Sequence, residues 1–313
     1  MPDEKGFRPI KILYANDGSE HAQAALELIV NLQMPPEAEI HNVGVLIPRE
    51  SSNHAVLERV LEVSENKLKQ NNITVNTNII LGYPQEILIE YSNQINADLI
   101  IIGAKGLRST LGILLGGVAQ QIIEYATRPV LVVRAPYHRF DTIAIVTDGS
   151  IYSNQAVNFI TGSVADPSAS GCQMFPLPED VEIKVVHVLP PVPSPELITR
   201  SWPMGTEIIP IYEPDTPAEE EWIGQHKPKG ERILEQATEQ LMRCDFSAEP
   251  VLLWGDAATE IIDYTRSHEI NLIIAGSRGL SQMRGWFLGS VSRKLVHYSD
   301  SSVLIVKSPS LET

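Results

Sequence analysis

Two patterns of apolar residues alternate along the first half of the chain. Short runs rich in Ile, Val and Leu are typical of buried strands, and longer segments with an apolar residue every three or four positions are typical of helices. Strands that alternate with helices favour parallel pairing through right-handed crossovers. The pattern predicts strands at 10–15, 39–46, 73–80, 98–103 and 130–134, and helices from Ser19 to Val30 and at 53–70, 84–95 and 116–126.

The second half of the chain repeats the first, which indicates a tandem duplication. The matching blocks are 10–20 with 141–151, 39–48 with 182–191, and 82–133 with 255–306. The last pair aligns without a gap, with 17 identities in 52 positions. We therefore predict an α/β protein of two tandem Rossmann-like domains, at residues 1–137 and 138–313. Each is expected to hold a five-stranded parallel sheet sandwiched by helices.

The offset between the copies grows along the chain, which places two insertions in the second copy, at about 163–180 and 192–229. The second insertion is acidic and rich in proline, which lacks a backbone donor, so we expect little regular structure there. Its apolar residues leave two interpretations open, a mobile surface loop or a lid or partner-docking element. These residues are Trp202, Ile208, Ile209, Ile211 and Trp222.

Composition and charge narrow the class of protein. The formal charge of −15 and the pI near 5.0 disfavour binding to nucleic acid, whose backbone is also negative. No membrane span or secretory leader is recognisable, so we expect a cytoplasmic protein. Cys172 and Cys244 lie far apart in the sequence, which favours two free thiols and excludes a structural zinc site.

The residues that follow the strands are the first candidates for chemistry, because ligands of open parallel sheets bind beyond the carboxyl ends of the strands. In the second copy the fourth strand is followed by Gly276 and Gly279 and, after nine further residues, by Gly289 and Ser290. Glycine lets the backbone approach a ligand closely, and the free amides at a helix start favour an anion. The Ser290 hydroxyl could also donate to a phosphate oxygen. A phosphate-binding loop is one interpretation, and glycines that merely end strands are the other.

Other residues at the strand ends also have two interpretations. Asp17 and Asp148 each follow the first strand of a copy, where an aspartate can cap a turn or face a ligand. Their matched positions favour the second role. Lys105 and Arg278 are either solvated loop charges or partners of a phosphate. His187 fits a pocket wall better than a catalytic role, since no nucleophile or acidic partner can be assigned beside it.

These segments resemble the universal stress protein family, whose nucleotide-binding members carry the motif G-x2-G-x9-G-[S/T]. The second copy matches this motif in full, and the resemblance covers almost the whole chain apart from the two insertions. It implies an adenine nucleotide alpha hydrolase-like fold in which Asp148 and Val188 line the adenine and ribose pocket. The phosphates would lie on the glycine loop and the following helix. The second predicted site comprises Asp148, Val188, Gly276, Arg278, Gly279, Gly289, Ser290 and Val291.

The first copy departs from the motif at one position, where Gly117 stands in place of Ser or Thr. Losing a hydroxyl donor to a phosphate costs about 1.5–3 kcal/mol, so we expect binding there to be weakened rather than abolished. The loop before Gly117 is also unusually apolar. The first predicted site comprises Asp17, Val45, Gly103, Gly106, Gly116 and Gly117.

The sequence therefore predicts an adenine-nucleotide-binding regulatory protein of the stress response. Its expected ligand is ATP, with ADP or a cyclic nucleotide as alternatives and Mg²⁺ as a companion of the phosphates. The resemblance implies that the two modules pack as a pseudo-dimer within one chain, and it leaves open whether chains pair further. No general base or arginine finger is recognisable, so we expect slow ATP hydrolysis at most. The alternative is a nucleotide-independent interaction module of the same fold, whereas an adenylyl-transferring enzyme is disfavoured because its HxGH and SGGxDS signatures are missing.

Overall fold

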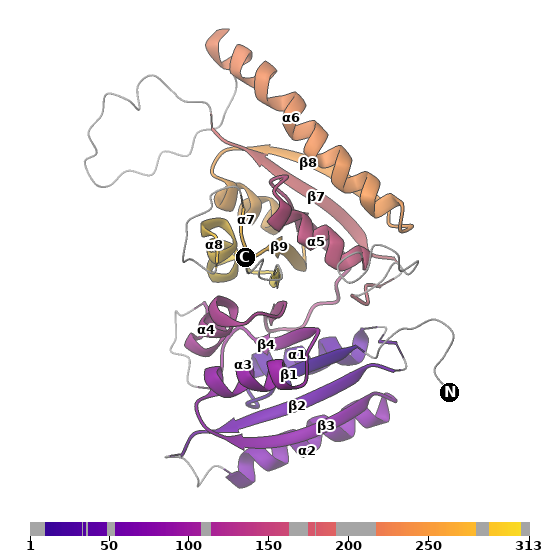
Figure 1. Ribbon diagram of the computed structural model, residues 1–313, viewed down its shortest axis with the longest axis vertical. Helices are drawn as coiled ribbons and strands as arrows, with labels where there is room; N and C mark the ends of the chain where they lie inside the picture. Colours follow the sequence, from indigo (N-terminus) through magenta and orange to yellow (C-terminus); the bar gives the residue numbers. More distant parts are fainter. Residues whose placement is uncertain are drawn as a thin grey trace, which may run out of the picture.

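One continuous sheet runs through both copies in the computed structural model (Figure 1). The structure describes residues 10–32, 34–35, 37–48, 54–107, 114–162, 175–178, 180–191, 217–279 and 288–307. The strand order is β3-β2-β1-β4-β5-β10-β9-β6-β7-β8, so the first copy fills one half of the sheet and the second copy the other.

The elements of the first copy lie close to where the hydrophobic pattern predicts them. They are β1 (Lys11–Ala15), α1 (Glu20–Asn31), β2 (Glu39–Leu46), α2 (His54–Gln70), β3 (Thr74–Leu81), α3 (Pro84–Gln94), β4 (Leu99–Gly103), α4 (Gly117–Tyr125) and β5 (Val130–Val133). Helix α1 begins after Ser19, whose hydroxyl accepts a hydrogen bond from the amide of Ala22 as the predicted N-cap.

The second copy repeats this order. Its elements are β6 (Thr142–Val146), α5 (Ile151–Thr161), β7 (Glu182–Leu189), α6 (Pro217–Met242), β8 (Ala248–Trp254), α7 (Ala257–Ser267), β9 (Leu272–Gly276), α8 (Ser290–Tyr298) and β10 (Ser302–Val306). Within each copy all strands pair in parallel. The expected fold class, two tandem α/β units with five-stranded parallel sheets, is confirmed.

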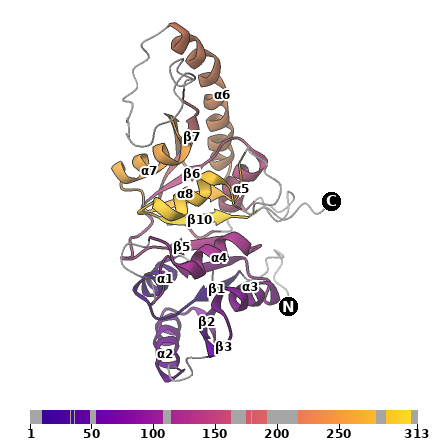
Figure 2. The same ribbon diagram turned by 90° about the vertical axis from the view of Figure 1, so that its left-hand side faces the viewer.

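The two copies are joined by the antiparallel pair β5 and β10, in which Leu131 lies opposite Leu304. Helices cover both faces of the sheet, and each face has a core that extends across the junction. One core includes Leu28 of α1 and Val157 of α5, and the other includes Ile122 of α4 and Leu295 of α8. Figure 2 shows α4 and α8 on either side of the junction.

The prediction of irregular structure over 192–229 is wrong from residue 217 onward, where α6 begins (Figure 1). Pro217 stands in the first turn, where its missing amide costs nothing. Pro228 stands inside the helix and removes one hydrogen bond. Downstream of it, Leu234 and Leu241 are buried in the core, and this packing stabilises a helix that the proline disfavours. The residues Trp202, Ile208, Ile209 and Ile211 lie outside the described residues.

Two further findings bear on the sequence predictions. The prediction of free thiols is wrong, since Cys244, the cysteine in the described part of the chain, is bonded in a disulfide. Among the described residues, no helix is both long and apolar enough to cross a membrane.

Candidate functional site

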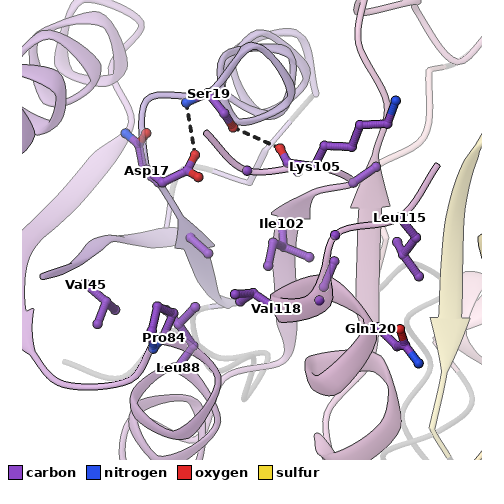
Figure 3. A pocket seen from close by; sticks show the side chains of 18 of the residues that line it. Asp17, Ser19, Val45, Pro84, Leu88, Ile102, Lys105, Leu115, Val118 and Gln120 are labelled. Atoms are coloured by element: carbon purple, nitrogen blue, oxygen red, sulfur yellow. Dashed lines mark hydrogen bonds between the residues drawn. The ribbon is translucent and has the colours of Figure 1, made fainter. Parts of the chain in front are cut away.

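Each copy has a cavity at the carboxyl edge of its half of the sheet. The cavity of the first copy, which we call cavity one, has a volume of about 520 Å³. That of the second copy, cavity two, has a volume of about 280 Å³. The structure brings all predicted residues of the first copy together in the wall of cavity one, and all those of the second copy together in the wall of cavity two. Figure 3 shows cavity one.

The Asp-Gly-Ser segment forms the same tight turn in both copies. In the first, the carboxylate oxygen Oδ1 of Asp17 accepts a hydrogen bond of 2.9 Å from the amide of Ser19, and Gly18 adopts a left-handed φ of +79° between them. In the second, Asp148 Oδ1 accepts from the Ser150 amide at 3.0 Å. A left-handed φ favours glycine, which explains the residue between the acid and the serine. One oxygen of each aspartate therefore has the turn-capping role.

The second oxygen of Asp17 faces the glycine loop. Its Oδ2 accepts a hydrogen bond of 3.1 Å from the amide of Leu107, and it lies 2.6 Å from where a Cβ on Gly106 would stand. In the second copy a Cβ on Gly279 would collide with Asp148 Oδ2 in the same way. The second glycine of the motif is thus explained by the closely placed carboxylate, and the aspartate and the loop form one unit.

The loop closes onto the start of the next helix. The amide of Gly116 donates to the carbonyl of Ala104 at 2.8 Å, and the amide of Gly289 donates to that of Ser277 at the same distance. Both glycines are N-caps without a side chain to bond the first-turn amides of α4 and α8. Those amides and the positive end of the helix dipole are suited to an anion in the cavity.

The two helix starts differ at one residue, Gly117 in α4 and Ser290 in α8, as the sequence indicates. A Cβ added to Gly117 would meet no atom within 4 Å. The space for a serine side chain is therefore present in the first copy, although the hydroxyl is missing.

The two basic residues of the loops line the cavities. Lys105 belongs to the wall of cavity one, where its carbonyl accepts a hydrogen bond of 3.1 Å from the Ser19 hydroxyl (Figure 3). Arg278 belongs to the wall of cavity two, with its guanidinium 5.9 Å from the ring centre of Tyr152. Figure 3 shows the Lys105 side chain extending away from Asp17.

Burial favours the neutral form of the two histidines near the cavities. His187 lies in the wall of cavity two, and its Nδ1 donates to the carbonyl of Thr147 at 2.8 Å. Burial lowers its pKa. Near the first copy, His21 Nδ1 accepts from the amide of Ala135 at 2.8 Å, and burial, with Lys105 as a smaller cause, lowers the pKa of His21. A neutral His187 whose Nδ1 is engaged by a carbonyl fits the predicted pocket wall.

Sequence reasoning missed one wall of each cavity. Pro84 and Leu88 of α3 line cavity one, and Ala257 and Ile261 of α7 line cavity two. The signal was present in the gap-free alignment of 82–133 with 255–306, which pairs these residues and keeps all four apolar. Periodicity places them on helices but does not say that this helix face borders a cavity.

Comparisons with known proteins identify the family to which this chain is similar. The chain matches the model of the Universal stress protein family over residues 10–134 and 139–307. A universal stress protein of Methanocaldococcus jannaschii is 29% identical over 140 residues, 40% of this chain and 82% of that protein. The universal stress protein YxiE of Bacillus subtilis is 28% identical over 168 residues, 54% of this chain and 99% of that protein.

Solved structures extend the likeness to the whole fold. A universal stress protein from Archaeoglobus fulgidus superposes with a TM-score of 0.62 at 19% identity, and the match covers 96% of this chain and 99% of that one. At this level of identity the likeness shows a shared fold over nearly the whole length of both chains.

Proposed function

This chain belongs to the universal stress protein family, and we propose that it is a regulatory protein that binds an adenine nucleotide, with ATP as the expected ligand. Each module, 1–137 and 138–313, supplies one site. The observation that carries the proposal is the convergence, in each copy, of a carboxylate, a glycine loop and an uncapped helix start on a single cavity. Both cavities are near the size range of small-molecule sites, about 300–1,000 Å³.

The wall residues divide into three chemical parts in this proposal. Apolar side chains, Val45 with Leu88 in cavity one and Val188 with Ile261 in cavity two, cover the adenine ring. Asp17 or Asp148 accepts hydrogen bonds from ribose hydroxyls. The glycine loop and the first amides of α4 or α8 hold the phosphates, with Mg²⁺ as their companion.

The two sites differ in what they offer a nucleotide. Cavity two has the Ser290 hydroxyl and the Arg278 guanidinium, whereas cavity one has Lys105 and the larger volume. The hydroxyl favours tighter phosphate binding in cavity two, and the volume favours cavity one for a whole nucleotide. We propose that both bind and that the phosphate contacts are stronger in cavity two.

A second candidate function is a nucleotide-independent interaction module. Leu107 and Leu114 favour it, because these apolar side chains are 70% and 44% exposed at the two ends of the glycine loop in the first copy. An apolar rim of this kind suits a protein surface as well as a ligand.

The nucleotide content of the purified protein separates the two functions. The protein is heat-denatured, and the supernatant is analysed by anion-exchange chromatography beside a Ser290→Ala preparation. We expect one or two adenine nucleotides per chain, with the share of cavity two reduced in the variant. No nucleotide after purification, followed by no heat on titration with Mg²⁺ and ATP, would favour the interaction module.

A further inference from the structure

The helices that begin at the two cavities lie side by side at the junction of the copies, with the end of each near the start of the other (Figure 2). Helix α4 starts at cavity one and α8 at cavity two. Between them, Arg293 of α8 forms an ion pair with Glu124 of α4 at 3.4 Å. A movement at the end of either helix therefore reaches the other copy directly.

The carboxyl end of each of these helices is bonded by a cation from the other copy. Arg134, which follows β5, donates from Nη2 to the carbonyl of Val296 in α8 at 2.7 Å. Lys307, which follows β10, donates from Nζ to the carbonyl of Ile123 in α4. Both pairs are related by the same offset in the repeat. The carbonyls belong to the last turn, where helices leave them unbonded and where a positive charge is favourable.

Arg134 makes a second bond that reaches cavity one. Its Nη1 donates at 2.7 Å to the carbonyl of Leu114, which directly precedes Leu115 and Gly116 in the wall of that cavity. The backbone amide of Arg134 donates to the hydroxyl of Ser302 in β10, at 3.1 Å, and fixes the residue at the junction. The planar guanidinium thus holds the glycine loop of the first copy and the last turn of α8 at once.

We propose that Arg134 is a positioning residue that couples the two cavities. A ligand that orders the loop in cavity one fixes the carbonyl of Leu114, and this holds the guanidinium in place for Val296. The last turn of α8 is then more firmly closed, and the helix start in cavity two is better ordered for its own ligand. Regulation of nucleotide binding by this coupling rests on the proposed function. The link that Arg134 makes between the glycine loop of the first copy and α8 does not depend on it.

The coupling has a defined size and direction. The effect is positive and, because linkage is reciprocal, a ligand in cavity two must strengthen binding in cavity one by the same factor. We expect a factor of about five to ten, at the lower end of measured couplings between sites.

The link is tested first without any ligand. Gly106→Ala displaces the loop, because its Cβ would collide with the Asp17 carboxylate, and amide hydrogen exchange is then measured in α8. We expect exchange in the last turn of α8 to rise about fivefold. Gly117→Ala is the matched control, since its methyl group enters open space and leaves exchange in α8 unchanged.

The decisive variant is Arg134→Lys. A lysine can still bond the carbonyl of Val296, as Lys307 bonds that of Ile123, but it does not offer the two-pronged donor that also reaches Leu114. In this background Gly106→Ala is expected to leave exchange in α8 unchanged. Equal responses with Arg134 and with Arg134→Lys, or no response in either, would overturn the coupling.

A second measurement uses ATP with Mg²⁺. In a Val188→Trp variant, whose side chain fills cavity two, ATP can enter only cavity one, and its binding is followed by calorimetry. We expect bound ATP to slow exchange in the last turn of α8, and to do so only when Arg134 is present. ATP binding with no change of exchange in α8 would contradict the coupling. No heat of ATP binding at either cavity of the parent would contradict the proposed function. In that case the exchange measured with Gly106→Ala would still test the link between the loop and α8.

Discussion

The carboxylate of Asp17 lies against the Cα of Gly106, so close that a Cβ on Gly106 would stand 2.6 Å from Oδ2. These residues are far apart in the sequence, but the position of each depends on the other. Asp17 ties the loop through the Leu107 amide, and only glycine leaves room for it to do so. The aspartate of the turn and the glycine of the motif act as one structural unit, which is repeated by Asp148 and Gly279.

Replacing this glycine is therefore expected to destabilise the protein. Gly106→Ala should lower the free energy of unfolding by about 1–3 kcal/mol, the usual cost of overpacking. Gly117→Ala should raise it by about 0.5–1 kcal/mol, because the methyl group meets open space in a helical position. Urea unfolding followed by circular dichroism measures both. A change in the free energy of unfolding of the same sign for the two variants would show that the Asp17 contact does not constrain Gly106.

The hydroxyl at the helix start is expected to set the difference in phosphate binding. Ser290→Ala should weaken ATP binding at cavity two about tenfold to hundredfold, the effect of losing one donor to a charged phosphate. Gly117→Ser should strengthen binding at cavity one by a comparable factor, since the side chain has free space. Isothermal titration calorimetry of each variant, with the other cavity filled by Val45→Trp or Val188→Trp, resolves the sites. Affinities equal to those of the parent would refute the role of the hydroxyl.

Acid is expected to destabilise the junction through His21. The pKa of His21 is lower in the folded protein than in the unfolded chain, where it is near 6.5. The contribution of His21 to stability is therefore present above about pH 6.5 and is lost as the pH falls below that value. The imidazolium form also cannot accept from the Ala135 amide, which costs about 1 kcal/mol.

Urea unfolding of the parent and of His21→Gln at pH 7.5 and pH 5.0 tests this, because glutamine retains an acceptor and does not titrate. On acidification, we expect the free energy of unfolding of His21→Gln to fall by about 1 kcal/mol less than that of the parent. His187→Gln is expected to change the pH dependence in the same direction, since burial lowers the pKa of His187 as well. An identical pH dependence for the parent and His21→Gln would disprove the role of His21.

Alkali is expected to have the opposite effect through Lys307, which is 9% exposed. Burial, and secondarily the charge of Arg278, lower the pKa of this ammonium to about 8, while Glu124 acts in the other direction. The unfolded chain then binds more protons than the folded protein between about pH 8 and 10, so this group makes stability rise with pH over that range, by about 2–3 kcal/mol.

The Lys307→Met variant isolates this contribution. Its stem fills the same apolar space but does not titrate, so the difference in unfolding free energy between parent and variant should shift in favour of the parent from pH 8 to pH 10. Other groups that titrate in this range cancel in the difference. A difference that is constant with pH would show that Lys307 keeps an ordinary pKa.

Much of this architecture could be predicted from the chain because the interactions that set it are local. The β-branched runs place the strands, Ser19 caps α1 as expected, and the repeated glycine pattern identifies the loops that the structure brings to both cavities. The failure at α6 has an equally physical cause. Proline at 228 disfavours a helix locally, but burial of residues such as Leu234 and Leu241 depends on strands from other parts of the chain.

The sequence by itself determined the duplication, the parallel α/β units and the residues gathered at each carboxyl edge, because periodicity and motif spacing are properties of the chain. Tertiary structure alone decided that the two halves share one sheet through β5 and β10, and that Arg134 holds Leu114 and Val296 together. It also decided that Pro84 and Leu88 border a cavity. These relationships depend on how distant segments meet, and neither hydrophobic period nor motif spacing encodes which carbonyl a side chain will reach across a junction.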